Sequence, residues 1–116
     1  MNIEEFREYC LHLPAVTEET PFGPDTLVFK VKGKMFALCD IENFESINLK
    51  IEPEQGELLR EQYPQITSGY HMNKKHWITV VHEGLSHKFV RELTKNSYEL
   101  VKKGLTKKLQ KEIELG

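Results

Sequence analysis

The sequence predicts an α+β fold. The expected form is a single compact domain with helices packed on one side of an antiparallel β-sheet, in the order α-β-β-β-α-β(β)-α. Segments that alternate apolar and polar residues are interleaved with segments whose apolar residues recur at helical spacing, and prolines and glycines mark the boundaries. The 116 residues, 39% hydrophobic and 29% charged, suit one hydrophobic core but not two. We therefore predict a single domain over residues 1–116, with a core of about 3–105 and a helical tail of 106–116.

The first helix is predicted from its ends. Asn2 can cap it and Glu5 can complete a capping box, while Pro14 ends the helical pattern. Residues 15–25 then form a connector whose Phe22 is expected to close the edge of the core.

Four strands follow from the alternation of apolar and polar residues. A tight turn at Lys32-Gly33-Lys34 makes the first two a β-hairpin, and Gln65 to Tyr70 offers a further short extended piece. The predicted strands are Thr26 to Val31, Met35 to Ile41, Ser46 to Ile51 and Trp77 to His82.

Two further helices are predicted in the second half of the chain. Pro53 suits the first turn of a helix over 54–63 that directs Leu58, Leu59 and Tyr63 inward. Ser86 can cap a long helix that ends near Gly104.

Charge is distributed unevenly along the chain. Residues 1–63 carry 13 acidic and 6 basic side chains, whereas residues 64–116 carry 5 acidic and 10 basic ones, within a net charge of −2. This asymmetry is typical either of a polyanion-binding surface opposite an acidic one or of lysine-rich solvated helix faces, and the solvated reading is preferred for the C-terminal lysines.

No apolar run is long enough to span a bilayer, and the acidic start of the chain differs from a secretory signal, so we expect a cytoplasmic protein without a membrane role. Cys10 and Cys39 lie in apolar patterns without Cys-x-x-Cys spacing, which favours two buried thiols in a reducing compartment.

The stretch from Gly69 to Trp77 is the densest run of functional side chain types. It combines two imidazoles, two ammonium groups, an amide, a phenol and the single tryptophan before a predicted strand. Nucleic-acid binding needs cations for phosphates together with aromatic or amide groups that reach bases. The predicted contact residues are Lys30, Lys32, Lys34, Lys50, His71, Asn73, Lys74, Lys75 and His76.

Several blocks of the sequence together resemble the MmcQ/YjbR family of small bacterial proteins over roughly Ile3 to Leu105. They are Pro21–Asp25, Phe29–Val31, Gly33–Ala37, Asn48–Lys50, Leu59–Arg60, Tyr63–Pro64, Tyr70–Trp77 and Ser97–Val101. The resemblance implies a fold similar to that of CyaY and frataxin, with a double-wing DNA-binding motif. The expected partner is DNA, bound weakly and in a salt-sensitive way, because a sequence pI near 6.2 is low for a dedicated DNA-binding protein.

Each residue of this stretch also has a structural interpretation. Trp77 suits an anchor at the edge of the core better than a stacking platform, and the Asn73 amide can hold a turn. His71 is equally suited to a structural hydrogen bond and to a ligand contact. In the alternative hypothesis, Phe22, Tyr70 and Trp77 line a pocket for a small molecule or a protein segment, and the lysines serve only solubility.

Catalytic signatures are absent from the sequence: we find no nucleophile elbow, phosphate loop, zinc-protease motif or dinucleotide fingerprint. The histidine spacings match no tetrahedral zinc site. Surface glutamates of the first helix need no metal, although the CyaY-like resemblance raises iron as an analogy. We therefore predict a non-enzymatic monomer without a cofactor or a metal.

Overall fold

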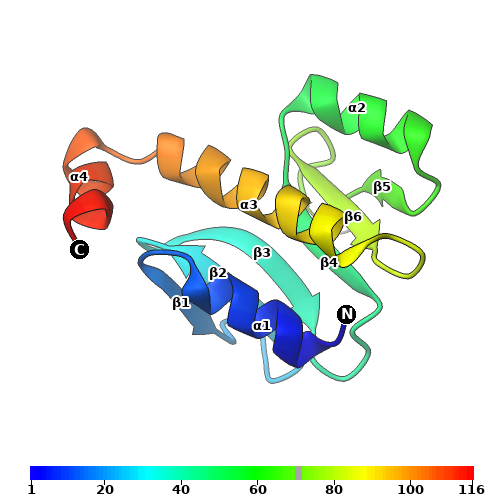
Figure 1. The fold of residues 1–116 in the computed structure, drawn as a ribbon, viewed down its shortest axis with the longest axis horizontal. Helices are drawn as coiled ribbons and strands as arrows, with labels where there is room; N and C mark the ends of the chain where they lie inside the picture. The colour runs from blue at the N-terminus through cyan, green and yellow to red at the C-terminus, as the bar shows by residue number, and fades with distance from the viewer. Residues whose placement is uncertain (70–71) are drawn as a thin grey trace.

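The computed structural model describes residues 1–69 and 72–116. In these residues six strands form one sheet in the order β1-β2-β3-β4-β6-β5, and every neighbouring pair is antiparallel (Figure 1). The elements along the chain are α1 (Ile3–His12), β1 (Val16–Glu19), β2 (Thr26–Val31), β3 (Lys34–Asp40), β4 (Ser46–Lys50), α2 (Pro53–Gln62), β5 (Ile66–Ser68), β6 (Trp77–Val81), α3 (His87–Lys103) and α4 (Lys107–Leu115).

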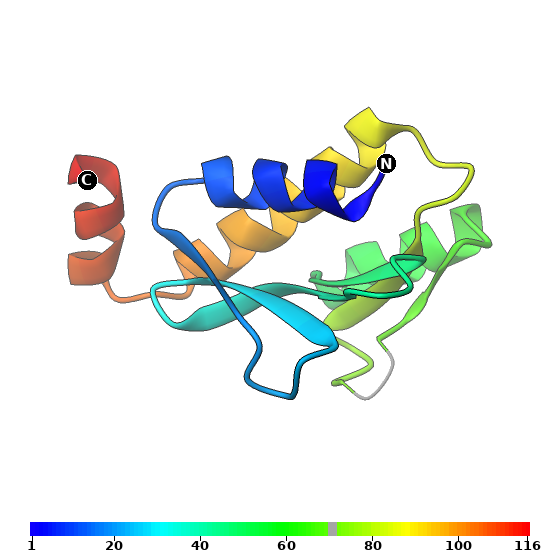
Figure 2. The ribbon, with the colours of Figure 1, turned by 90° about the horizontal axis from the view of Figure 1, so that it is seen from below.

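The helices gather on one side of the sheet, as predicted. Figure 2 shows α1 and α3 above the strands, with α2 beside β5 and α4 at the C-terminal end, whereas the opposite face of the sheet carries no helix. The main core fills the space between the sheet and these helices and contains the fully buried Phe6, Phe29 and Phe36. Tyr98 of α3 is also buried there, and its hydroxyl donates a 2.7 Å hydrogen bond to the Pro14 carbonyl. Among the described helices, none is both long and apolar enough to cross a membrane.

The predicted helix starts are confirmed in atomic detail. The Asn2 side chain accepts a hydrogen bond from the Glu5 backbone N–H at 2.8 Å, and the Glu5 carboxylate accepts one from the Asn2 N–H at 3.0 Å. Ser86 caps α3 by accepting from the Phe89 N–H at 3.0 Å. These caps satisfy N–H groups that the first turn of a helix leaves without internal partners.

The hairpin between β2 and β3 is also confirmed. Lys32 and Gly33 both adopt positive φ angles, 49° and 82°, as a two-residue type I′ turn requires. A bulge between Phe29 and Lys30 shifts the register of this pair, so that Phe29 pairs with Ala37 and Lys30 with Met35. Because of this shift, Phe36 points into the main core while Met35 reaches the helix-free face.

The connector predicted over 15–25 was wrong in part, because Val16–Glu19 is strand β1, paired with β2 at the edge of the sheet. Val16 is the only apolar residue of β1, so the alternation was too weak to predict a strand. The charged residues Glu18 and Glu19 are nevertheless typical of an edge strand. The prediction that two further side chains point into the core was also wrong. Phe22 is 64% exposed rather than closing the core, and Leu58 is 58% exposed.

Candidate functional site

The helix-free face of the sheet carries a second, smaller apolar cluster. Across the strands, Val28 pairs with Leu38, Leu38 with Asn48 and Asn48 with Thr79, so these four side chains lie in one row on this face. Val28, Leu38 and Trp77 are buried there, and Met35 and Met72 pack against them. Met35 and Met72 therefore cover part of this face, although none of the described helices lies on it.

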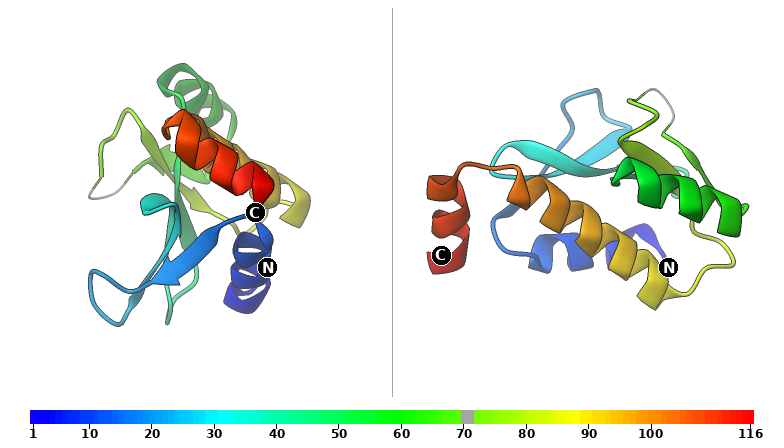
Figure 3. Two further views of the ribbon diagram at one scale, coloured as in Figure 1. Left: turned by 90° about the vertical axis from the view of Figure 1, so that its left-hand side faces the viewer. Right: turned by 90° about the horizontal axis from the view of Figure 1, so that it is seen from above.

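Two loops project from this face, away from the helices. One is residues 20–25 between β1 and β2, and the other is residues 72–76 before β6 (Figures 2 and 3). Between them lies a hollow of about 540 Å³, which we call the open-face groove. Phe22 and Met72 from the two loops line it, together with sheet residues Thr26, Met35, Leu38, Cys39, Asp40, Ser46 and Asn48.

Lysines meet at one end of the sheet because neighbouring strands run in opposite directions. Lys34 begins β3, Lys50 ends β4 opposite Trp77, and Trp77 begins β6 two residues after Lys75. A smaller hollow of about 260 Å³ at this end is lined by Lys34, Met35, Lys50 and Trp77 together with residues from the C-terminal part of α3. We call this region the lysine end. Met35 lines both hollows, so the open-face groove and the lysine end adjoin.

Two of the predicted cations are already paired within the protein. The Lys30 ammonium lies 2.6 Å from the Glu19 carboxylate of the edge strand, and the Lys32 ammonium lies 3.3 Å from the Glu112 carboxylate of α4. In the described part of the chain, no ion pair involves Lys34, Lys50, Lys74 or Lys75. The structure thus divides the predicted lysines into a neutralised pair and an available set of four.

The loop before β6 is held by Asn73. Its side-chain oxygen accepts hydrogen bonds from the backbone N–H groups of Lys75 at 2.9 Å and His76 at 3.3 Å, and its carbonyl accepts from Trp77 at 3.0 Å. Asn73 therefore has the structural role that its amide suggested, while Lys74, Lys75 and His76 are exposed. Trp77 is 9% exposed, as expected of an anchor. Tyr70 and His71, predicted as pocket and contact residues, lie outside the described residues.

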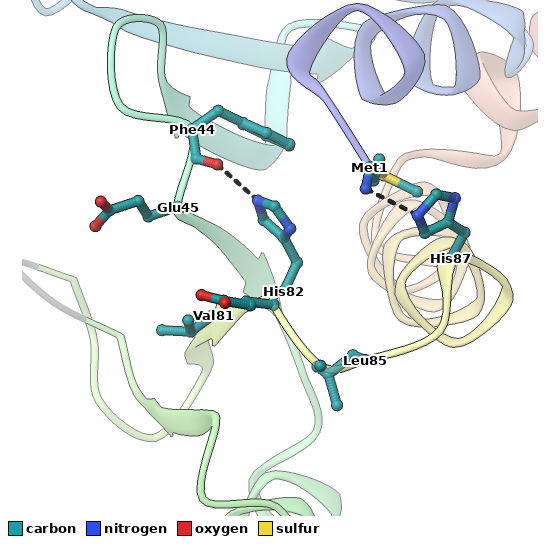
Figure 4. Close-up of a pocket in the computed structure, with 9 residues that line it drawn as sticks. Met1, Phe44, Glu45, Val81, His82, Leu85 and His87 are labelled. Atoms are coloured by element: carbon teal, nitrogen blue, oxygen red, sulfur yellow. Dashed lines mark hydrogen bonds between the residues drawn. The ribbon is translucent and has the colours of Figure 1, made fainter.

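The histidines after β6 have structural partners. A hollow of about 550 Å³ at the opposite end of β4 and β6 is lined in part by Met1, Phe44, His82 and His87 (Figure 4). His82 Nε2 lies 2.6 Å from the Phe44 carbonyl oxygen, and the two rings pack with centroids 4.6 Å apart. The Met1 amino group lies 2.8 Å from His87 Nε2. These contacts account for both imidazoles by packing and hydrogen bonding.

Neither cysteine has the character of a nucleophile. Burial raises the pKa of Cys10 well above its ordinary value. Burial, followed by the nearby Asp40 carboxylate, raises the pKa of Cys39 to about 12. Both thiols are therefore protonated near neutral pH, although Cys39 borders the open-face groove. Within residues 1–69 and 72–116, no three histidine, cysteine or carboxylate side chains are grouped as a metal site would require.

The structure adds residues that the sequence did not single out. Met35 and Met72 are part of the groove lining, and Glu19 neutralises Lys30. Asn48 lies in the predicted strand Ser46 to Ile51 but is not one of the predicted contact residues, and its side-chain oxygen accepts a 2.7 Å hydrogen bond from the Thr79 hydroxyl. The alternation within β4 and the block Asn48–Lys50 were the sequence signals for Asn48, whereas the position of Met72 against the sheet depends on the tertiary structure.

Comparison with known proteins gives consistent matches. The YjbR family model matches residues 11–100. Uncharacterized protein YbdF of Escherichia coli O157:H7 is 43% identical over 115 residues, covering 97% of this chain and 94% of the relative. Uncharacterized protein YjbR of Escherichia coli K12 is 34% identical over 85 residues, which is 72% of each chain.

Solved structures agree with the fold. The crystal structure of Deinococcus radiodurans protein DR2400, described as a DUF419 domain, has a TM-score of 0.90 and 45% identity, and the match covers 97% of this chain and 88% of that one. A Pseudomonas syringae protein matches in its crystal structure with a TM-score of 0.72 and 32% identity, over 86% of this chain and 98% of its own. The residues that the family model matches, 11–100, include both loops and all four available lysines. Because the model matches most of its length, the chain belongs to the YjbR family.

Proposed function

We propose that this protein binds nucleic acid through the helix-free face of its sheet, with phosphates at the lysine end. The observation that carries this proposal is the convergence of Lys34, Lys50, Lys74 and Lys75, for which no ion pair is found among the described residues. Ammonium groups that no carboxylate neutralises can exchange their counterions for phosphates, which is the main source of non-specific affinity for nucleic acid.

The low overall charge is compatible with local binding. The net charge is −2, but α1, whose sequence includes Glu4 and Glu8, lies on the helix side of the sheet (Figure 2). Physiological salt screens exposed charges over a Debye length of about 8 Å, so we expect the lysine end to act on a polyanion largely by itself. We expect weak affinity that decreases steeply as the salt concentration rises.

The test is a titration of the protein against labelled single-stranded and duplex DNA by fluorescence anisotropy at several salt concentrations. If all four lysines meet phosphates, the slope of log affinity against log salt is about −3 to −4. Lys74→Glu combined with Lys75→Glu should weaken binding by about tenfold or more. The matched control is Lys88→Glu with Lys95→Glu, which makes the same charge change at exposed positions of α3 on the helix side.

Two results would contradict the proposal. One is a dissociation constant weaker than about 100 μM for both kinds of DNA at low salt. The other is an equal loss of affinity in the loop variant and in the α3 control, because that would indicate a general charge effect rather than a site.

A second candidate function is favoured by the open-face groove. Its volume of about 540 Å³ and its lining by Phe22, Met35, Leu38 and Met72 are typical of a site for a small, partly apolar molecule without any nucleic-acid role. Trp77, the only tryptophan, packs in the adjoining cluster and provides a fluorescence probe. This candidate would be supported if a metabolite mixture quenches the Trp77 fluorescence in a saturable way and Phe22→Ala abolishes the quenching. The protein should then also fail to bind DNA.

A further inference from the structure

We propose, resting on the nucleic-acid binding inferred above, that the open-face groove receives one unstacked base of a single-stranded nucleic acid while the adjoining lysine end holds its phosphates. The protein would then discriminate single strands from duplexes. The two hollows adjoin at Met35, the groove walls carry apolar and aromatic side chains, and opposite charges lie at the two ends of the groove.

The open-face groove suits the base of a nucleotide, and the adjoining hollow at the lysine end suits its phosphate. The groove is lined mainly by apolar side chains, and Met35 separates it from the adjoining hollow that Lys34 and Lys50 line. Lys102 and Lys103, in the last turn of α3, add positive charge near the same end. An apolar planar group in the groove and a phosphate beyond Met35 would therefore each meet side chains of suitable chemistry.

The groove walls suit a flat aromatic guest. Phe22 projects from one loop with 64% of its surface exposed, and Met72 faces the groove from the other. A base can stack on an aromatic ring whatever its sequence identity, and thioethers adapt to planar aromatic groups. A large exposed phenylalanine has no packing role in the core, so a stacking contact gives it a function.

Two polar side chains that line the groove, Asn48 and Asp40, can form hydrogen bonds with the edge of the base. The Asn48 side-chain oxygen is occupied by the Thr79 hydroxyl, and no hydrogen bond of the Asn48 amide NH₂ is found among the described residues. The Asp40 carboxylate holds a turn by accepting from the N–H groups of Glu42 and Asn43 through Oδ1. Its other oxygen can accept a hydrogen bond from the exocyclic amino group of a base.

The charges fix the direction of the strand. Asp40 lies at one end of the groove and repels phosphate, whereas the lysines lie at the other end and attract it. The bound base therefore points toward Asp40. Cytosine and adenine, which carry exocyclic amino groups, should bind better than thymine, which has none. A base inside a duplex is stacked and paired and must leave the helix before it can enter such a site.

The experiment compares four labelled ligands by anisotropy at one salt concentration: oligo(dC), oligo(dT), an oligonucleotide of abasic sites and a duplex, all of one length. We expect oligo(dC) to bind tightest, and the abasic strand and the duplex to bind about tenfold or more weakly. Phe22→Ala should weaken oligo(dC) binding by about fivefold or more without changing the salt slope, while Phe22→Tyr should retain the affinity. Phe22 is exposed, so neither change threatens folding.

The outcomes separate this inference from the proposed function. If the abasic strand and the duplex bind as tightly as oligo(dC), and Lys74→Glu with Lys75→Glu still weakens all of them, the groove does not receive a base although the lysine end binds phosphates. If none of the four ligands binds, the proposed function itself is wrong. If free CMP binds as tightly as the strand and competes with it, the groove is a site for a free nucleotide and the inference of a strand is overturned.

Discussion

Ser97 of α3 donates a hydrogen bond of 2.6 Å to the carbonyl oxygen of Phe36 in β3. The same hydroxyl accepts a hydrogen bond of 2.8 Å from the backbone N–H of Lys50 in β4. Strands β3 and β4 are paired only from Ala37 to Cys39, so these two backbone groups lie just beyond the ladder. One buried hydroxyl thus links both strands to the helix, next to the lysine end.

Replacing Ser97 with alanine should lower the free energy of unfolding by about 2–4 kcal/mol, because two buried backbone groups would lose their partner. Urea unfolding followed by circular dichroism measures this loss. Asn96→Ala, at the exposed neighbouring position, is the control and should change stability by less than about 0.5 kcal/mol. A Ser97→Ala variant as stable as the control would mean that water replaces the hydroxyl.

Gly69 should not tolerate a side chain. A Cβ atom at this position would lie 2.7 Å from the Cβ of Trp77, and the Gly69 N–H donates a 2.8 Å hydrogen bond to the Trp77 carbonyl. Gly69→Ala must therefore displace Trp77 or separate the ends of the loop, at a cost of about 1–3 kcal/mol. A lower melting temperature and a shifted tryptophan emission would report this change.

The matched control for Gly69 is Gly104→Ala. Gly104 has a negative φ of −79°, and its added Cβ would make only an ordinary contact of 3.4 Å with the Val101 carbonyl oxygen. We expect its stability to stay within about 1 kcal/mol of the parent protein. Equal effects of the two substitutions would contradict the steric explanation.

Glu19→Gln should increase the affinity for nucleic acid. The substitution removes the carboxylate that neutralises Lys30 and so makes Lys30, on the helix-free face, a fifth available cation. We expect the affinity to increase about threefold at low salt. The slope of log affinity against log salt should become more negative by about 0.9. Glu8→Gln, an equal charge change on the exposed side of α1, is the control and should leave the affinity unchanged. Unchanged or weaker binding of Glu19→Gln would place Lys30 outside the site.

Stability should decrease at alkaline pH because of the two buried thiols. Burial raises the pKa of Cys10 and Cys39 in the folded protein, the latter to about 12, above the ordinary value of 9.0. Above pH 9 the unfolded chain releases these protons while the folded protein retains them. The stability that the two protonated thiols contribute is thus complete below about pH 9 and is lost as the pH rises toward about 12. The free energy of unfolding should decrease by up to about 1.4 kcal/mol per pH unit for each thiol.

Urea unfolding at a series of pH values from neutral to alkaline tests this dependence. A variant carrying Cys10→Ala and Cys39→Ala should be less stable at pH 7 but lose less stability above pH 9. Part of the decrease should remain, because burial also raises the pKa of Tyr9 and Tyr98. Identical slopes for the parent and the variant would show that the thiols ionise as freely in the folded state as in the unfolded one.

The sequence predicted most of the fold because local signals were strong. The Asn2 cap, the Lys32-Gly33 turn and the alternation over Thr26–Val31 each act within a few residues, so they can be recognised without knowing the tertiary structure. Strand β1 escaped prediction because its identity comes from pairing with β2 rather than from its own composition. The exposure of Leu58 could not be predicted either, because α2 buries Gly56, at a position where an added Cβ atom would lie 3.1 Å from the Ile51 side chain.

The candidate site was predictable as a set of residue types but not as an arrangement. The sequence by itself determined the α+β class, the family resemblance, the lysine-rich turn and the role of Trp77 as an anchor. Only the tertiary structure decided which lysines are available, because Glu19 and Glu112 reach Lys30 and Lys32 from distant parts of the chain. It also decided that Phe22 and Met72, 50 residues apart in the sequence, line one groove, because the sheet brings them to the same face. Ion pairs and hollows depend on non-local distances, and no local pattern of residues encodes those distances.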